Sequence, residues 1–257
     1  MALLSIVTPI FNPGPYLEAA LDSVARLPIP HEHVVADGGS TDGTVELLKA
    51  REDPSLTWVS EPDRGQTDAV NKGLARARGD LLMWVNGDDE VVSEGVARAV
   101  AHLERNPSTD VVYGGLDFTD AEGVVRREYR PAAWDWRRYL LLGDYIPEPT
   151  IIWRRSRMER TGMLDERWVD AADYDFFLRL THATGVDRMP DPHVRFRWHA
   201  TSKSATDVWR QQDEALQIRL QWSRTWRDRA VMVGFDRLKR ALLPALTRGR
   251  WPAPFAE

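Results

Sequence analysis

The chain has 257 residues and a formal net charge of -5, with 43% hydrophobic residues, 28% charged residues and no cysteine. This length and apolar content suit one large α/β domain with an appendage, and the negative charge argues against general nucleic-acid binding, which usually leaves a strongly basic footprint. The lack of cysteine excludes disulfides and thiolate metal sites, so any metal must be bound by oxygen or imidazole.

No uninterrupted apolar segment approaches the length of a membrane span. The first residues, Leu3 to Pro9, follow neither a basic region nor a small-residue cleavage signal, so we expect no secretory peptide. These features predict a cytoplasmic protein, and peripheral contact with the inner face of the membrane stays open as an alternative.

The N-terminal half alternates between short apolar segments and segments with helical periodicity. Apolar runs typical of buried strands occupy residues 5–11, 31–36, 56–59 and 81–85. Each is followed by a helical pattern, at residues 17–24, 45–51, 66–78 and 93–104. This alternation predicts a three-layer α/β fold with a mostly parallel, Rossmann-like sheet and right-handed crossovers.

Acidic residues follow three of these strands. Asp37, Asp63 and Asp88 lie at or just past the predicted strand ends, and open α/β sheets bind their ligands at this edge. The glycine-rich loop 37–44 lacks the glycine spacing of a dinucleotide fold and the Gly-Lys-Ser/Thr ending of a P-loop, so we exclude both.

The apolar run 81–85 leads directly into Asn86-Gly-Asp-Asp89. A hard oxygen ligand at this position could hold a divalent metal against a diphosphate. The alternative is a loop whose acidic residues, or Ser93, cap the helix that follows.

The C-terminal half contains strands, helices and a basic tail. We predict strands at residues 110–118 and 124–129, a helix at 134–142 and a Pro-rich turn into a strand at 146–154. A helix follows with an apolar face formed by Phe176, Phe177 and Leu180, and then a strand-like segment up to His199. From about Asp207 onward, Trp and Arg recur with helical spacing, which predicts two or three further helices.

Four segments in the N-terminal half resemble glycosyltransferase family 2. They are Ser5-Ile-Val-Thr-Pro-Ile-Phe-Asn12, Asp37-Gly-Gly-Ser-Thr-Asp-Gly-Thr44, Glu61-Pro-Asp-Arg-Gly-Gln-Thr-Asp-Ala-Val-Asn-Lys-Gly73 and Trp84-Val-Asn-Gly-Asp-Asp89. One segment alone is a weak signal, but four in the same order with suitable spacing are specific. The resemblance implies the GT-A fold and an enzyme that uses a nucleotide-sugar.

On the donor side, the resemblance implies that Pro9, Phe11 and Asp37 hold the nucleotide base and ribose. It places three further residues near the nucleotide and the diphosphate: Gln66, Asp68 and Asn71. From the residues alone, strand-end packing would equally explain Pro9 and Phe11, and a solvated helix face would explain Asp68 and Asn71.

Asn86 stands where the family often has the first aspartate of an Asp-x-Asp pair. An amide can hydrogen-bond the ribose or a metal-bound water but brings no charge, so Asp88 becomes the favoured direct ligand of Mn²⁺ or Mg²⁺. Asp89 would then orient its neighbours or cap the next helix. In similar enzymes a later histidine completes the metal shell or binds the diphosphate, and His199 fits that place; the alternative is a structural or solvent-exposed histidine.

On the acceptor side, Ala172-Asp-Tyr-Asp175 resembles the family's Glu-Asp motif. The resemblance implies that Asp173 is the catalytic base, with Ala172 at the usual glutamate position and Asp175 as the competing candidate. An acidic residue at a helix start is also favoured by the helix dipole alone. A segment comparable to 146–154 lies beside the acceptor in the family, which would place Glu148 and Thr150 at acceptor hydroxyls; the alternative is a Pro-rich turn without a ligand.

The resemblance therefore implies a metal-assisted, inverting transfer of a sugar to a hydroxyl acceptor, either a saccharide, a lipid-linked saccharide or a small molecule. A UDP-sugar is the favoured donor, although dTDP- or GDP-sugars would use a similar pocket. Two alternatives stay open. One is a catalytically weak nucleotide-sugar-binding module, which Asn86 and Ala172 favour. The other is a sugar nucleotidyltransferase, although residues 10–15 lack the basic residue expected of its first loop.

We divide the chain into a catalytic domain, residues 1–205, and a C-terminal helical extension, residues 206–257. Residues 1–108 form the nucleotide-sugar-binding half of the catalytic domain, and residues 109–205 form its acceptor-binding half. The extension is expected to pack on the catalytic domain or to form a homo-oligomer. Its basic, Trp-bearing helices also suit peripheral contact with anionic lipid.

Overall fold

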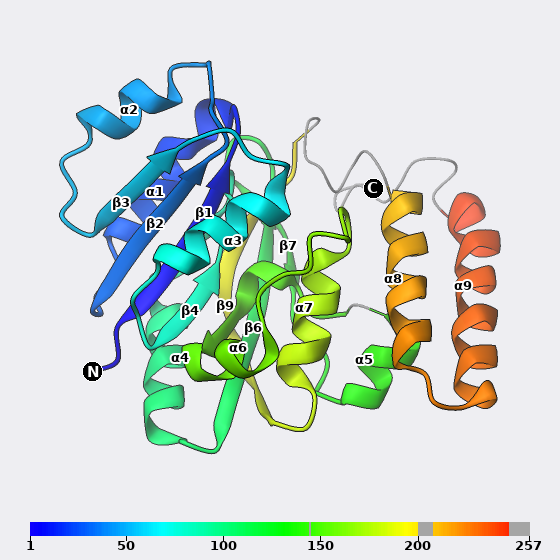
Figure 1. The fold of residues 1–257 in the computed structure, drawn as a ribbon. Helices are drawn as coiled ribbons and strands as arrows, with labels where there is room; N and C mark the ends of the chain where they lie inside the picture. The colour runs from blue at the N-terminus through cyan, green and yellow to red at the C-terminus, as the bar shows by residue number, and fades with distance from the viewer. Residues whose placement is uncertain (144, 200–207, 247–257) are drawn as a thin grey trace.

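The computed structural model describes residues 1–143, 145–199 and 208–246 (Figure 1). Its strands are β1 (Leu4–Ile10), β2 (His31–Asp37), β3 (Leu56–Ser60), β4 (Leu81–Trp84), β5 (Glu90–Val91), β6 (Thr109–Thr119), β7 (Val125–Tyr129), β8 (Ile151–Arg154) and β9 (Gly185–Arg197). Its helices are η1 (Gly14–Tyr16), α1 (Leu17–Ala25), α2 (Thr44–Ala50), α3 (Gln66–Arg76), α4 (Ser93–Arg105), α5 (Trp136–Leu142), η2 (Glu148–Thr150), α6 (Arg155–Thr161), α7 (Ala172–Thr181), α8 (Val208–Trp222) and α9 (Trp226–Leu246).

The strands form one nine-stranded sheet in the order β3-β2-β1-β4-β8-β6-β9-β5, with β7 paired to β6. The first four strands run parallel to one another, and β8 runs antiparallel to both β4 and β6. Because β9 is parallel to β6, six of the nine strands share one direction. The predicted mostly parallel α/β sheet is thus confirmed, with antiparallel strands in its second half.

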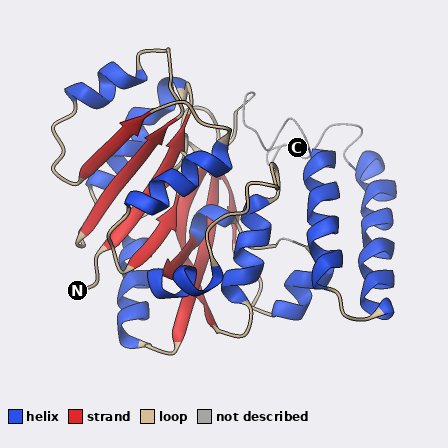
Figure 2. Cartoon of the chain, viewed as in Figure 1, coloured by secondary structure: helices blue, strands red, loops and turns tan. Residues whose placement is uncertain are grey.

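Helices cover both faces of the sheet (Figure 2). Ile6 and Met83 pack with apolar side chains of α1 and α4 on one face. Val7 and Trp84, one residue further along each strand, pack with α3 and α7 on the other face. Successive side chains of a strand point to opposite faces, so these strands are apolar on both sides and produce the predicted three layers.

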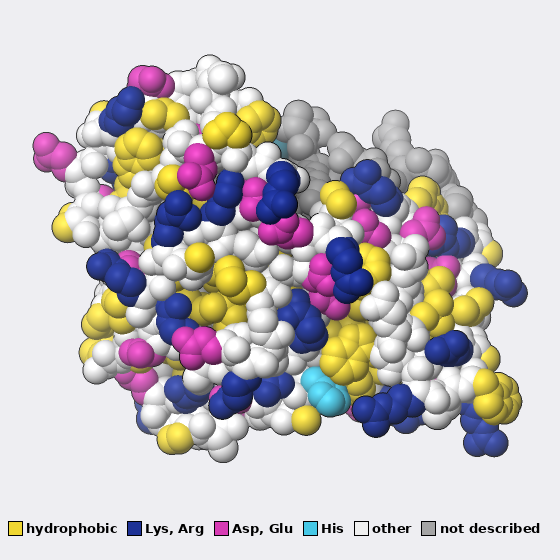
Figure 3. Space-filling model, viewed as in Figure 1, with side chains coloured by type: hydrophobic (Ala, Val, Ile, Leu, Met, Phe, Trp, Pro, Cys, Tyr) yellow, Lys and Arg dark blue, Asp and Glu magenta, His cyan; other side chains and the backbone are white. Residues whose placement is uncertain are grey.

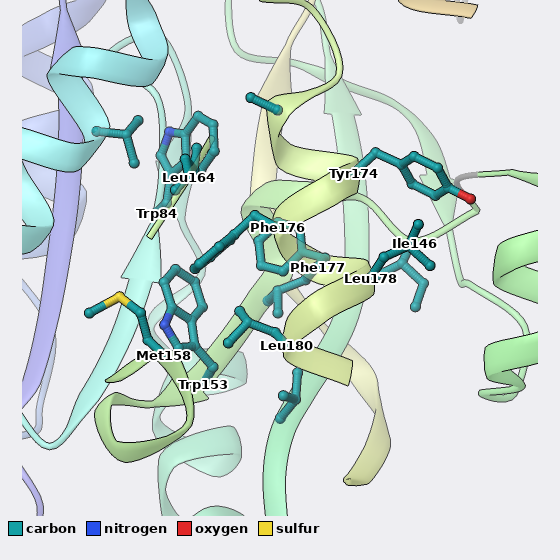
Figure 4. Close-up of a cluster of buried hydrophobic side chains, with 14 of the residues drawn as sticks. Trp84, Ile146, Trp153, Met158, Leu164, Tyr174, Phe176, Phe177, Leu178 and Leu180 are labelled. Carbon is teal, nitrogen blue, oxygen red and sulfur yellow. The ribbon is translucent and has the colours of Figure 1, made fainter. Parts of the chain in front are cut away.

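Helix α7 is fixed by aromatic packing (Figure 4). The rings of Phe176 and Phe177 meet the indole of Trp153 edge-on, with centroids 5.5 and 5.7 Å apart, and all three side chains are buried. Removing one such aromatic side chain from a core costs about 3–5 kcal/mol. The start of α7 is therefore held firmly relative to the sheet.

Strand β9 is longer than the sequence pattern predicted. It begins at Gly185, whereas the strand-like pattern was recognisable only from Val194. Pro190 and Pro192 conceal the earlier part, because proline cannot donate a ladder hydrogen bond. The β6–β9 register indeed shifts on either side of the Gly115–Pro192 pair. The short strand β5 and helix α6 were not predicted either.

Two helices, α8 and α9, make up the described part of the C-terminal extension and lie side by side next to α5 (Figure 1). Ile218 of α8 and Met232 of α9 are fully buried in the same core cluster as α7. The extension therefore packs on the catalytic domain, one of the two arrangements expected. The proposed boundary at residue 205 lies outside the described residues, so the division into domains stays a prediction. Among the described helices, none is long and apolar enough to cross a membrane.

Candidate active site

A cavity of about 530 Å³ opens at the edge of the sheet where β1 and β4 end. Segments from both halves of the chain and from α8 surround it. The lining residues are Pro9, Ile10, Phe11, Asn12, Pro13, Asp63, Gly65, Gln66, Thr67, Ala69, Trp84, Asn86, Gly87, Asp88, Glu148, Val169, Asp170, Ala172, Asp173, Phe196, His199 and Gln211.

On the donor side, Pro9 and Phe11 line the cavity, and their contact with a nucleotide base and ribose stays a prediction. Pro9 is buried in β1, but the Phe11 side chain is 64% exposed, so core packing does not explain an aromatic residue there. Asp37 ends β2 without lining the cavity. Its carboxylate is buried and accepts hydrogen bonds from the hydroxyls of Ser40 and Ser60, both at 2.5 Å, which hold the loop after β2.

Asp63 lines the cavity beside these residues, and its position depends on a glycine. A Cβ atom added at Gly38 would lie 2.2 Å from the Asp63 Oδ2 atom. Only a residue without a side chain leaves room for the Asp63 carboxylate in its present place. The sequence pattern predicted Asp63 at this edge of the sheet but indicated no role for it.

Asn86 is the centre of a small hydrogen-bond network. Its Oδ1 atom accepts hydrogen bonds from Gln66 Nε2 at 2.8 Å and from Trp84 Nε1 at 3.1 Å. All three residues line the cavity. The amide at the family's usual aspartate position is thus held in one orientation by β4 and the start of α3.

Two other predicted donor-side residues lie away from the cavity. Asp68 pairs with Lys72 at 3.3 Å and accepts the Arg64 backbone N–H, which lowers the pKa of its carboxyl together with the side chains of Arg64 and Lys72. Asn71 both donates to the Leu164 carbonyl and accepts the Leu164 backbone N–H. The Asn71 contacts join α3 to the segment before α7, whereas the Asp68 contacts hold the start of α3, and neither residue lines the cavity.

His199 and Asp88 meet at the other end of the donor side. His199 Nε2 lies 3.1 Å from Asp88 Oδ2, and its ring lies 4.7 Å from the ring of Tyr16. The neighbouring Arg197 donates from Nε to the Asp88 carbonyl at 3.2 Å and lies over the Tyr16 ring. These contacts hold the end of β9 against the loop after β4.

Asp89 is not part of the cavity lining. It is 1% exposed, and its Oδ1 atom accepts the backbone N–H of Arg197 at 2.9 Å. Burial, followed by repulsion from Asp88, raises the pKa of the Asp89 carboxyl well above its ordinary value. Helix α4 starts after Val92 without a side-chain cap, so the alternative role of this loop as a helix cap is not observed.

Among the described residues that line the cavity, carboxylates outnumber cationic side chains. The described lining contains Asp63, Asp88, Asp170, Asp173 and Glu148 but no Lys or Arg. Within the described ranges, no group of three or more His, Asp or Glu side chains could hold a metal ion. The neighbouring Asp88 and His199 offer one carboxylate and one imidazole, donors that suit Mn²⁺, so the diphosphate and water would have to supply the other ligands.

On the acceptor side, the structure separates the two candidate bases. Asp173 lines the cavity, and its Oδ1 atom accepts the Tyr174 backbone N–H at 2.8 Å. Asp175, two residues later, is buried on another side of α7 and pairs with Arg179 at 2.9 Å. Ala172 also lines the cavity, at the position where the family often has glutamate.

Of the two predicted acceptor residues, only one lines the cavity. Glu148 lines the cavity from η2. Thr150 is fully buried, and its hydroxyl donates to the Pro147 carbonyl at 2.8 Å. This hydroxyl closes the η2 turn and does not reach the cavity, so we do not carry Thr150 forward as an acceptor contact.

Several lining residues were not singled out from the sequence. Gln211 belongs to α8, and Val169 and Asp170 belong to the loop before α7. No pattern identified them, because α8 reaches the cavity only through its packing on the catalytic domain. Asn12 had a weak signal, since it directly follows a predicted strand. Its positive φ of 46° and its hydrogen bond from the Thr41 backbone N–H fix the turn after β1.

Comparison with known proteins supports the resemblance. Residues 5–169 match the model of Glycosyl transferase family 2. An uncharacterized glycosyltransferase of Mycobacterium tuberculosis is 33% identical over 180 residues, 68% of each chain. A PGL/p-HBAD biosynthesis glycosyltransferase of the same species is 31% identical over 183 residues, 69% of each chain.

Solved structures share the fold. S. aureus TarS 1-349, in complex with UDP-GlcNAc, has a TM-score of 0.72 at 18% identity, over 95% of this chain and 74% of that one. The mannosyltransferase PcManGT from Pyrobaculum calidifontis, in complex with GDP-Man and Mn²⁺, has a TM-score of 0.64 at 20% identity, over 96% and 72%. The matched family region ends before Asp173, His199 and Gln211. The chain thus belongs to glycosyl transferase family 2 and is a glycosyltransferase with the GT-A fold.

Proposed function

We propose that this protein transfers a sugar from a nucleotide-diphosphate sugar, with UDP favoured, to a hydroxyl acceptor with inversion at the anomeric carbon. One observation carries the proposal. Asp88 and Asp173, which come from different halves of the chain, line the same cavity. In this proposal Asp88 would act beside the diphosphate, and Asp173 would act on the acceptor.

The donor would lie along β1 and the loop after β4. Phe11 offers an exposed ring for the nucleotide base, and Asn86, held by Gln66 and Trp84, offers its amide to the ribose or to a metal-bound water. UDP-GlcNAc and GDP-Man are bound by the two proteins of similar fold. Those complexes support a nucleotide-sugar as donor, and our preference for UDP rests on the family resemblance.

A divalent cation suits the charge of this cavity. A diphosphate among carboxylates, with no Lys or Arg in the described lining, requires a compensating positive charge. Asp88 and His199 would hold Mn²⁺ or Mg²⁺ there. When bound, the cation would stabilise the negative charge that the departing diphosphate gathers.

Asp173 would act as the general base. It accepts the acceptor's proton while the hydroxyl oxygen forms a bond to the anomeric carbon, and the bond from that carbon to the nucleoside diphosphate breaks on the opposite face. This single displacement inverts the anomeric centre. Glu148, which lines the same cavity, would hydrogen-bond another acceptor hydroxyl.

The D173N variant tests this function against the rival of a weak nucleotide-sugar-binding module. We expect transfer from UDP-sugars with Mn²⁺ to fall by about 10²–10⁴-fold, while the thermal shift caused by UDP and Mn²⁺ is retained. Transfer equal to that of the wild type would refute Asp173 as base. Nucleotide binding without any transfer or donor hydrolysis by the wild type would favour the binding module.

We also infer that α9 contacts an anionic lipid surface. The outer side of α9 exposes Val231, Leu238 and Leu242 to 48%, 52% and 47%, and Arg227 and Arg237 are exposed on the same helix. Figure 3 shows Lys and Arg side chains and hydrophobic side chains along the α8–α9 side. A basic helix with an apolar face favours an anionic membrane over a second, equally basic copy.

Vesicle sedimentation tests this contact. The full chain should bind vesicles with anionic lipid and not neutral vesicles, and L238E should weaken that binding without changing transfer to a water-soluble acceptor. Absence of binding, or a concentration-dependent dimer that L238E disrupts, would contradict the membrane contact and favour the oligomer.

A further inference from the structure

Glu214 of α8 binds the backbone just before α7. Its Oε2 atom accepts hydrogen bonds from three consecutive N–H groups, those of Val169 at 3.0 Å, Asp170 at 2.8 Å and Ala171 at 3.0 Å. Successive backbone N–H groups form a concave anion site, and a helix N-terminus favours negative charge. Ala171, the N-cap of α7, has no side-chain cap of its own. The carboxylate of another helix therefore satisfies these donors.

The segment that Glu214 contacts forms part of one wall of the cavity. Val169, Asp170, Ala172 and Asp173 all line it. A second contact comes from Arg210, one turn before Glu214, which forms an ion pair with Asp170. Thus α8 holds the segment both through its backbone and through a side chain.

Helix α8 is itself firmly placed. Ile218 is fully buried in the main core cluster. The Arg219 guanidinium, 1% exposed, donates to the Leu141 carbonyl of α5 at 3.3 Å. Because Ile218 and Arg219 anchor α8 about one turn after Glu214, Glu214 can transmit that position to the segment before α7.

We propose that Glu214 is a positioning residue, which sets the place of the Asp173 carboxylate in the cavity. This inference rests on the proposed function, in which Asp173 is the base. Hydrogen bonds to a charged group are about twice as strong as neutral ones, and a displacement of about 1 Å in a catalytic group can cost about 100-fold in rate. The C-terminal extension is accordingly part of the catalytic unit.

Hydrogen exchange tests the contact independently of activity. In full-length E214A, the peptide that contains residues 169–171 should exchange faster than in the wild type, with a smaller change in E214Q, whose amide oxygen can still accept. The control is Q217A, an exposed position on the same helix, which should match the wild type. Unchanged exchange at residues 169–171 in E214A would refute the contact. Since E214Q keeps the shape of the side chain, it tests the proposal even if E214A does not fold.

Kinetics test the consequence. We expect kcat of E214A to fall about 10–100-fold, with E214Q in between, while the Kd for UDP with Mn²⁺ stays within about twofold, because the donor residues lie on other elements. The acidic limb of the pH–rate profile should persist in E214A. Its loss would identify Glu214 as the base, and wild-type kcat with faster exchange would refute positioning.

The two proposals fail in different ways. If the wild type transfers no sugar from any nucleotide-sugar, the proposed function fails, and the exchange result still decides whether Glu214 holds the segment. If the wild type transfers sugar but E214A is as active as Q217A, only the positioning role fails.

Discussion

The imidazole Nε2 of His199 lies 3.1 Å from the Oδ2 atom of Asp88, although 111 positions separate the two residues. This pair joins the end of β9 to the loop after β4 at the rim of the cavity. In the described structure, this pair brings a carboxylate and an imidazole together on the side of the cavity proposed for the donor.

The first prediction concerns this pair. In D88N the amide can still contact His199, but the negative charge that a divalent cation needs is gone, so transfer should fall by about 10²–10³-fold. Thermal-shift titration of UDP with and without Mn²⁺ should show that the metal-dependent part of the shift is lost. The matched control is D22N, whose carboxylate is a half-exposed surface partner of Arg51. A wild-type response to Mn²⁺ in D88N would exclude Asp88 as the metal ligand.

The second prediction separates two aspartates of α7. Asp175 pairs with Arg179 away from the cavity, so D175N should lower stability by about 1–3 kcal/mol and leave the kcat of the folded enzyme nearly unchanged. D173N should instead lower kcat and leave the stability nearly unchanged. Urea unfolding and initial rates measure the two effects, and a D175N enzyme that is stable but inactive would reverse the assignment of the base.

The third prediction concerns Gly38. In G38A the new Cβ would collide with the Asp63 Oδ2 atom, which can move because it ends a side chain. We therefore expect a folded protein whose Kd for UDP rises about tenfold, equivalent to about 1.4 kcal/mol.

G234A provides the control for that glycine. Gly234 lies within α9 with nothing within 4 Å of an added Cβ, so alanine should stabilise the protein by about 0.5–1 kcal/mol. Isothermal titration and thermal melts measure both variants. Normal UDP binding in G38A would show that the position of Asp63 does not matter for the donor.

The fourth prediction is a loss of stability in mild acid. Burial lowers the pKa of His33 to about 3 and that of His193 to about 4, against 6.5 for the free side chain. Between these values the unfolded state binds more protons than the folded state, so the contribution of the two histidines to stability is complete above pH 6.5 and declines as the pH falls below it. Each histidine lowers the folding constant by up to about tenfold per pH unit.

Urea unfolding from pH 7.5 to 4.5 measures this effect. Glu32, whose carboxyl has a lowered pKa, loses its contribution only below its ordinary value of 4.5, so it does not obscure the histidines. H193Q should reduce the slope of stability against pH. An unchanged slope in H193Q would mean that His193 is already protonated in the folded protein.

The sequence alone determined the α/β class and the edge at which the site forms. Strands with uninterrupted apolar runs must be covered on both faces, and parallel strands bring the loops that follow them to one edge. The order of strands and loops was enough to predict Asp37, Asp63 and Asp88 at this edge. The family resemblance, and not the order of strands, implied that Pro9, Phe11, Gln66 and Asn86 belong to the same site.

Only the tertiary structure decided which neighbouring side chains reach the cavity. Asp173 and Asp175 lie two positions apart on one helix, and the packing of Phe176 and Phe177 on Trp153 turns the first toward the cavity and the second away. Asn71 bonds to the backbone of Leu164, a distant partner that no local pattern reveals, whereas the Thr150 hydroxyl closes its own turn on Pro147. The contact of Glu214 with residues 169–171 likewise depends on how α8 packs, because long-range packing, and not local periodicity, sets the relative positions of distant segments.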